Sequence, residues 1–97
     1  MTPNRYDAKV DANQAEIVAA LRAVGASVYP LHTVGRGFPD IAVGYRGQNY
    51  FLEIKTGKGK LTLEEQEFFD TWQGRAGIVR SVEEALAFIG ATEEAAQ

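Results

Sequence analysis

The chain of 97 residues has no cysteine and only one histidine. The lack of cysteine excludes a disulfide framework, a thiolate zinc site and a cysteine nucleophile. One histidine cannot build a multi-histidine centre, so any metal here would be a hard ion held by oxygen, such as Mg²⁺ or Mn²⁺. No hydrophobic run approaches the ~20 residues needed to cross a bilayer, and the first residues do not resemble a signal peptide. We therefore expect an intracellular, cytoplasmic domain with no membrane segment.

Cations are in the minority, because 10 Lys and Arg residues stand against 13 Asp and Glu residues, for a formal net charge of -3. This balance argues against a protein that coats nucleic acid indiscriminately, since neutralising many phosphates requires many cations. It allows a protein that acts on nucleic acid through one local basic surface. The hydrophobic share of 45% and the short chain predict a single globular domain.

Capping signals predict three helices. In a capping box, the side chain at the helix start accepts a backbone hydrogen bond, and the residue three positions later returns one. A glycine after each periodic segment marks the helix end, because glycine adopts the left-handed conformation that terminates a helix. The helices are predicted to begin at Asp11, Thr62 and Ser81, paired with Gln14, Glu65 and Glu84, and to end at Gly25, Gly74 and Gly90.

Strands are predicted at residues 26–31, 40–45, 49–55 and 77–80. The turn Arg46-Gly47-Gln48 indicates a hairpin between the second and third strands. The first three strands should form an antiparallel meander, and the fourth should pair in parallel after a helical crossover. We expect one mixed α/β domain over residues 11–90, with helices packed on the sheet and tails at residues 1–10 and 91–97.

Two charged residues lie in the apolar strand predicted at residues 49–55. Side chains alternate along a strand, so Glu53 and Lys55 share one face with Phe51. If the hairpin pairs in simple register, Asp40 at the start of one strand lies close to both at the end of the other. Two carboxylates and an ammonium group would then converge, which suits metal-assisted hydrolysis of a phosphodiester. The alternative is an ordinary charge pair on a half-exposed strand face.

The order and spacing of these residues resemble a nuclease signature. The string Gly35-Arg36-Gly37-Phe38-Pro39-Asp40, twelve residues and then Glu53-Ile54-Lys55 resembles the G-x-PD…E-x-K motif of PD-(D/E)XK nucleases. Together with Glu16 before the motif and Gln66 after it, the chain resembles the stand-alone, phage-type VRR-NUC (virus-type replication-repair nuclease) domains. The resemblance covers residues 11–90 and implies a restriction-endonuclease-like mixed sheet with helices packed on it.

The resemblance implies a role for each residue of the motif. Asp40 and Glu53 would bind Mg²⁺ or Mn²⁺, and the main-chain carbonyl of Ile54 would add a ligand. Lys55 would be the catalytic lysine. The chain would then be a nuclease that hydrolyses DNA phosphodiester bonds.

Two further positions are supporting candidates under the same resemblance. Glu16 would be an additional catalytic acid and metal ligand, and its alternative is a solvated residue on the helix flank. Gln66 would help to position Lys55 or a phosphate, and its alternative is a surface amide. The family also implies flap, branched or single-strand-containing DNA as substrate, and a homodimer.

Candidate DNA contacts follow from local charge. Between residues 33 and 60, five cations stand against two carboxylates. Arg36 lies between two glycines beside Asp40, and Lys58 and Lys60 follow the strand that carries Lys55, so all three suit contact with the phosphate backbone. His32 could donate to a phosphate or close the end of the first strand. The rival interpretation of the whole chain is a non-catalytic nucleic-acid-binding or protein-interaction domain on the same fold.

Overall fold

The computed structural model describes residues 5–91, with side chains from Ala12 onward. These residues form a mixed sheet and three helices, in the order α1 (Arg5–Ala23), β1 (Ser27–Pro30), β2 (Ile41–Tyr45), β3 (Gln48–Ile54), α2 (Leu63–Thr71), β4 (Ala76–Val79) and α3 (Val82–Phe88). The strand order is β1-β2-β3-β4, with the first three antiparallel and β3 parallel to β4. The predicted mixed α/β fold, with its meander and its parallel fourth strand, is confirmed.

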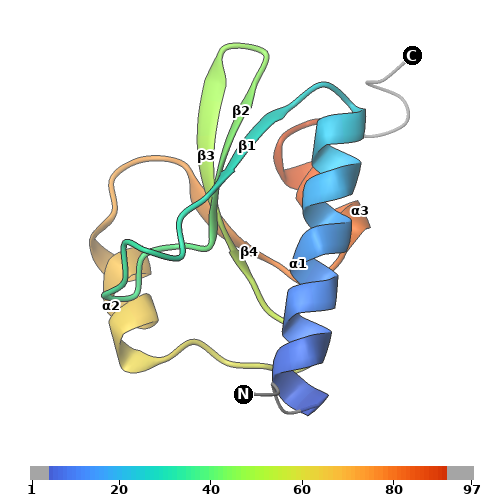
Figure 1. Ribbon diagram of the computed structural model, residues 1–97. Helices are drawn as coiled ribbons and strands as arrows, with labels where there is room; N and C mark the ends of the chain where they lie inside the picture. Colours follow the sequence, from blue (N-terminus) through green and yellow to red (C-terminus); the bar gives the residue numbers. More distant parts are fainter. Residues whose placement is uncertain (1–4, 92–97) are drawn as a thin grey trace.

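The helices lie on opposite faces of the sheet (Figure 1). α1 and α3 contact each other and cover one face, whereas α2 lies against the other. Among the described side chains, Ile17 and Leu21 of α1 and Ala85 of α3 are buried in the core, so the apolar side of each helix faces the sheet. The resulting core contains Ile17, Leu21, Val28, Ile41, Val43, Leu52, Ile54, Val79, Ala85 and Ile89.

The hairpin between β2 and β3 sets the register of the sheet. Its two turn residues, Arg46 and Gly47, both have positive φ angles (50° and 81°), as in the tight turns whose twist matches antiparallel strands. Ile41 pairs with Leu52 in this register. Asp40 therefore lies at the open end of the hairpin, next to the residues that follow Leu52.

Two predictions about the ends of the domain are wrong. α1 begins at Arg5, so residues 5–10 are helical rather than a tail, and Asp11 and Gln14 lie inside the helix instead of capping it. No glycine or proline separates Arg5 from Asp11, so nothing in the sequence stops the helix there. At the other end, Ala91 is buried in the core and does not belong to the predicted tail. The remaining tail positions, 1–4 and 92–97, lie outside the described residues.

The start of α2 is the capping box that the sequence predicts. The Thr62 hydroxyl accepts a hydrogen bond from the Glu65 amide at 3.2 Å, and the Glu65 carboxylate accepts one from the Thr62 amide at 2.8 Å. The helix ends at Thr71, before the predicted Gly74, because Trp72 leaves it with an extended backbone.

α3 begins with half of its predicted box. The Ser81 hydroxyl accepts a hydrogen bond from the Glu84 amide at 3.1 Å. The Glu84 carboxylate accepts a hydrogen bond from the Arg80 amide at 2.8 Å rather than from the Ser81 amide. The hydrogen bond to the Ser81 hydroxyl is enough to fix the helix start, because it satisfies one of the free amides of the first turn.

Candidate active site

The hairpin register brings Asp40 to Glu53, as the sequence predicts. The Asp40 amide donates to the Leu52 carbonyl at 3.0 Å, which extends the β2–β3 pairing by one residue. The Asp40 Oδ2 atom accepts a hydrogen bond from the Ile54 amide at 2.7 Å. The main chain of β3 therefore holds this carboxylate directly beside Glu53.

Glu53 is a carboxylic acid buried in the sheet. Its residue is 3% exposed, and its Oε2 atom lies 3.4 Å from Lys55 Nζ. Its Oε1 atom has no hydrogen-bond partner among the described residues. The pKa of Glu53 is raised to about 8, first by burial and then by the nearby carboxylates of Asp40 and Glu65, which outweigh the opposing effect of Lys55. An unpartnered buried carboxyl oxygen is costly, so this position is suited to a cation.

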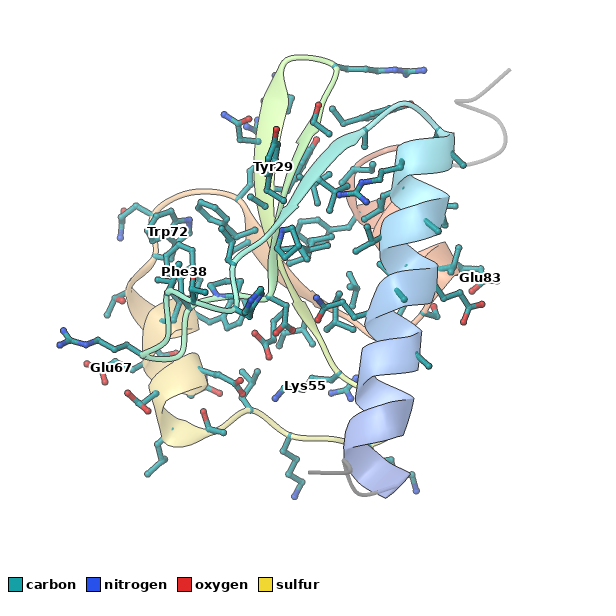
Figure 2. The ribbon with its side chains drawn as sticks, in the orientation of Figure 1. Tyr29, Phe38, Lys55, Glu67, Trp72 and Glu83 are labelled. Atoms are coloured by element: carbon teal, nitrogen blue, oxygen red, sulfur yellow. The ribbon has the colours of Figure 1, made fainter. Side chains whose placement is uncertain are left out.

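Lys55 is held from the opposite side of the site by a residue that the motif does not include. Glu65, in the first turn of α2, accepts from Lys55 Nζ at 2.7 Å, closer than Glu53. Burial lowers the pKa of Lys55, but the hydrogen bond to Glu65 and the charge of Glu53 outweigh burial and raise it. Burial likewise raises the pKa of Glu65, but Lys55 and the Thr62 amide outweigh it, and the net shift is downward. Figure 2 shows Lys55 between α2 and α1.

The loop before Asp40 sets the position of α2. Gly37 lies so close to the first turn of α2 that a Cβ atom there would collide with the Glu64 main chain, and its φ is +76°. Phe38 makes edge-to-face contacts with Phe51 of β3 and Phe68 of α2, at ring-centroid distances of 5.0 and 5.1 Å. Trp72 stacks on Phe68 at 5.0 Å and closes this aromatic cluster (Figure 2). The aromatic cluster therefore packs α2 against the sheet, as expected from the helical spacing of Phe68 and Trp72.

The structure does not bring the two supporting candidates into this cluster of charges. Glu16 is exposed on α1, and no hydrogen bond or ion pair among the described side chains joins it to the site. The Gln66 amide donates to Asp70 at 2.9 Å on the exposed side of α2. The contact with Lys55 that the resemblance implies for Gln66 is made by Glu65. Among the described side chains of α1, Asn13 contacts the site, because its Nδ2 atom donates to the Lys55 carbonyl at 3.4 Å.

Sequence reasoning missed Glu65 and Asn13 as site residues for different reasons. Glu65 was recognisable as the last member of a capping box, a signal that predicts a helix start and not a partner for a lysine. Asn13 lies in α1, which begins six residues before the predicted Asp11. No pattern in the sequence indicates that this part of the helix approaches the end of β3.

The predicted DNA contacts are exposed. Arg36, Lys58, Lys60 and His32 all lie on the surface, in the loops that flank Asp40 and Lys55. The loop with the two lysines is ordered by two hydrogen bonds. The Gly59 amide donates to the Thr56 carbonyl at 2.9 Å, and Arg80 Nη1 donates to the Gly57 carbonyl at 2.9 Å. These cations are therefore available to phosphates beside the site.

The donor set fits a hard, oxygen-ligated ion such as Mg²⁺ or Mn²⁺ better than a metal that prefers nitrogen or sulfur ligands. Among the described residues, no group of three or more His, Cys, Asp or Glu side chains is arranged to hold a metal. Asp40 and Glu53 offer two carboxylates that do not belong to the α2 capping box, and among the described residues the Oε1 atom of Glu53 is buried without a partner. Mg²⁺ commonly takes one or two carboxylates and completes its shell with water and phosphate oxygens. The residues present fit that pattern.

Comparison with known proteins identifies the fold. No family model matches the chain, and no curated protein sequence matches it. A solved structure described as a VRR_NUC domain is similar over 84% of this chain and 95% of its own, with 27% sequence identity and a TM-score of 0.66. The mixed sheet and its acidic edge thus define a nuclease-like α/β domain.

The resemblance inferred from the motif is confirmed by this match: the chain has the fold of a VRR-NUC domain, which supports a nuclease-family domain. Its restriction-endonuclease-like sheet has the helix and strand order that the resemblance implies. Within residues 5–91 there is no helix with the length and hydrophobicity needed to span a membrane.

Proposed function

We propose that this domain is a metal-dependent nuclease that hydrolyses DNA phosphodiester bonds, with a preference for flap or branched DNA. The observation that carries the proposal is the buried Glu53 carboxyl, which lies beside Asp40 and Lys55 and has an oxygen with no partner in the part of the chain that the structure describes. A carboxylate in that environment is stabilised by a cation, and a fixed ammonium group next to it suits work on a phosphate. The VRR-NUC fold supports the same reaction class.

Asp40 and Glu53 would hold one Mg²⁺ or Mn²⁺ ion, together with the Ile54 carbonyl. When bound, such an ion makes water more acidic and offsets negative charge on the phosphate. Lys55 Nζ orients the attacking water and stabilises the charge that develops on the phosphate oxygens. The water loses one proton to solvent as its oxygen bonds to phosphorus, and the bond to the leaving sugar oxygen breaks as that oxygen takes up a proton from solvent.

The substrate would be held by cations outside the chemical centre. Arg36, Lys58 and Lys60 would bind backbone phosphates and His32 would donate to one, which positions DNA without reading its sequence. Two copies of the domain would present two sites to a branched substrate, so we also propose a homodimer. A single 10.6 kDa species in light scattering would contradict the dimer. The roles implied for Glu16 and Gln66 stay predictions.

The test is cleavage of labelled linear, flap and four-way-junction DNA with Mg²⁺, Mn²⁺ or EDTA. We expect metal-dependent cleavage, and Lys55→Ala should lower its rate by about 10²- to 10⁴-fold, the usual contribution of a positioned proton-transfer group. Arg75→Ala is the matched control, because it removes a cation beside Tyr50, away from Asp40.

A second measurement follows metal binding without activity. Mg²⁺ or Mn²⁺ should raise the melting temperature of the wild-type domain, because a ligand that binds only the folded state stabilises it. Asp40→Asn should weaken this effect. No cleavage of any DNA together with no metal-dependent stabilisation would contradict the proposal and favour a non-catalytic nucleic-acid-binding or protein-interaction domain.

A further inference from the structure

We infer that Glu65 is the positioning residue for Lys55, an inference that rests on the proposed function. Glu65 does not belong to the PD…E-x-K motif and is not one of the proposed metal ligands. Its Oε1 atom nevertheless lies 2.7 Å from Lys55 Nζ, whereas the Glu53 oxygen of the motif lies 3.4 Å away. The shorter ion pair therefore joins the residue that follows β3 to α2, whereas the longer one joins two residues close together in the chain.

Glu65 is itself held by the main chain. The oxygen that accepts from Lys55 also accepts from the Thr62 amide at 2.8 Å, and the Glu65 amide returns a bond to the Thr62 hydroxyl. Gly37 packs directly against the main chain of Glu64 and Glu65. Two segments thus fix where the Glu65 carboxylate lies, the first turn of α2 and the loop that leads into Asp40.

A lysine needs such a partner more than a shorter side chain does. Its ammonium group lies on a flexible four-carbon stem, and ordering that stem during reaction costs conformational entropy. The ion pair with Glu65 orders the lysine stem before reaction. Both side chains are largely shielded from water, with exposures of 15% for Lys55 and 16% for Glu65. Because Glu65 lies outside the proposed donor set, a cation on Asp40 and Glu53 does not take this partner from Lys55.

The first test compares Glu65→Gln with Glu64→Gln in single-turnover cleavage of DNA. Glutamine can still accept from the Thr62 amide, so the helix start is kept while the charge facing Lys55 is lost. Glu64→Gln removes the same charge from the same helical turn. We expect Glu65→Gln to lower the cleavage rate by about 10- to 100-fold, as for partners that orient a ligand or catalytic group. The DNA concentration for half-maximal rate and the metal midpoint should not change, and Glu64→Gln should match the wild type.

A double variant separates positioning from a structural role. If Glu65 acts through Lys55, Lys55→Ala with Glu65→Gln should be no slower than Lys55→Ala alone. A further loss in the double variant would overturn the inference, and so would full activity of Glu65→Gln. A shifted metal midpoint with an unchanged maximal rate would also overturn it, because Glu65 would then serve the metal.

A measurement without DNA keeps the inference separate from the proposed function. The side-chain ammonium of Lys55 should give a slowly exchanging ¹⁵N-NMR signal, because an ion-paired, partly buried ammonium is protected from water. The signal should persist in Glu64→Gln and disappear in Glu65→Gln. If no DNA is cleaved but this pattern holds, the proposed nuclease function fails while the Lys55–Glu65 pairing stands. A signal unchanged in Glu65→Gln would overturn the pairing itself.

Discussion

Glu53 controls how the metal-free site responds to pH. Its pKa of about 8, against an ordinary value of 4.5, means that the folded state binds this proton more tightly than the unfolded state does. The stability contributed by the protonated form is complete below about pH 4.5 and is lost as the pH rises through about 8. Asp40, whose pKa burial also raises, acts in the same direction. Glu65 and Lys55 titrate outside this window, because the pKa of Glu65 is lowered and the pKa of Lys55 is raised.

We therefore expect the melting temperature in EDTA to fall between pH 5 and pH 8 in the wild type and to fall less in Glu53→Gln. Glutamine keeps the shape of the neutral acid, so at pH 8 the variant should melt higher, by about 5 °C or more. Thermal unfolding followed by circular dichroism at several pH values measures both effects. A wild type and a variant with parallel pH profiles would show that Glu53 does not titrate in this range.

α2 is the element whose position depends most on the rest of the chain. None of its nine residues, all of which the structure describes, is buried. It is attached through the aromatic cluster around Phe38, the close approach of Gly37 and the ion pair between Glu65 and Lys55. Two of these three attachments come from the loop that leads into Asp40, so the helix and the proposed metal-binding edge form one structural unit.

Gly37→Ala should test this attachment. The new Cβ would collide with the Glu64 main chain and strain a φ of +76°, so we expect a loss of about 2–4 kcal/mol in the free energy of unfolding. Gly35→Ala is the matched control, because Gly35 has a similar φ of +73° but open space around its Cβ position. It should cost only about 1–2 kcal/mol. Urea denaturation gives both values, and equal losses would show that the contact with α2 contributes nothing.

The charge of the whole molecule limits how it meets DNA. With a net charge of -3, the domain must bind phosphates through a local surface and not through its total charge. Lys58 and Lys60 offer such a surface beside Lys55, in a loop that Arg80 ties to the rest of the fold. The sheet places this surface and the β2–β3 turn at opposite ends of β3 (Figure 1).

Removing both loop lysines should therefore change the salt dependence of DNA binding. For Lys58→Ala with Lys60→Ala, we expect the slope of log K against log salt to fall in magnitude by about two, one for each lost phosphate contact. Arg46→Ala with Arg75→Ala removes the same charge near the other end of β3. If the control variant lowers the slope as much, the lysine loop is not the phosphate contact. Fluorescence anisotropy at several salt concentrations measures the slopes.

The sequence by itself determined the local features of this protein. The Thr62–Glu65 capping box, the Arg46-Gly47 turn and the alternation along β3 are encoded by residues within a few positions of one another. From them follow the strand order, the register and the approach of Asp40 to Glu53 and Lys55, because a hairpin with a short turn has one simple pairing. The start of α1 was misjudged, since Asp11 looks like a cap but nothing in the residues before it ends the helix.

Only the tertiary structure decided which residue of α2 faces Lys55. Consecutive residues of a helix point about 100° apart, so Glu65 and Gln66 cannot both reach the site. The choice depends on how the helix is rotated, and distant contacts at Phe38 and Gly37 set that rotation. The sequence motif therefore indicated the proposed reacting groups, whereas the packing of α2 against the sheet determined which carboxylate pairs with Lys55.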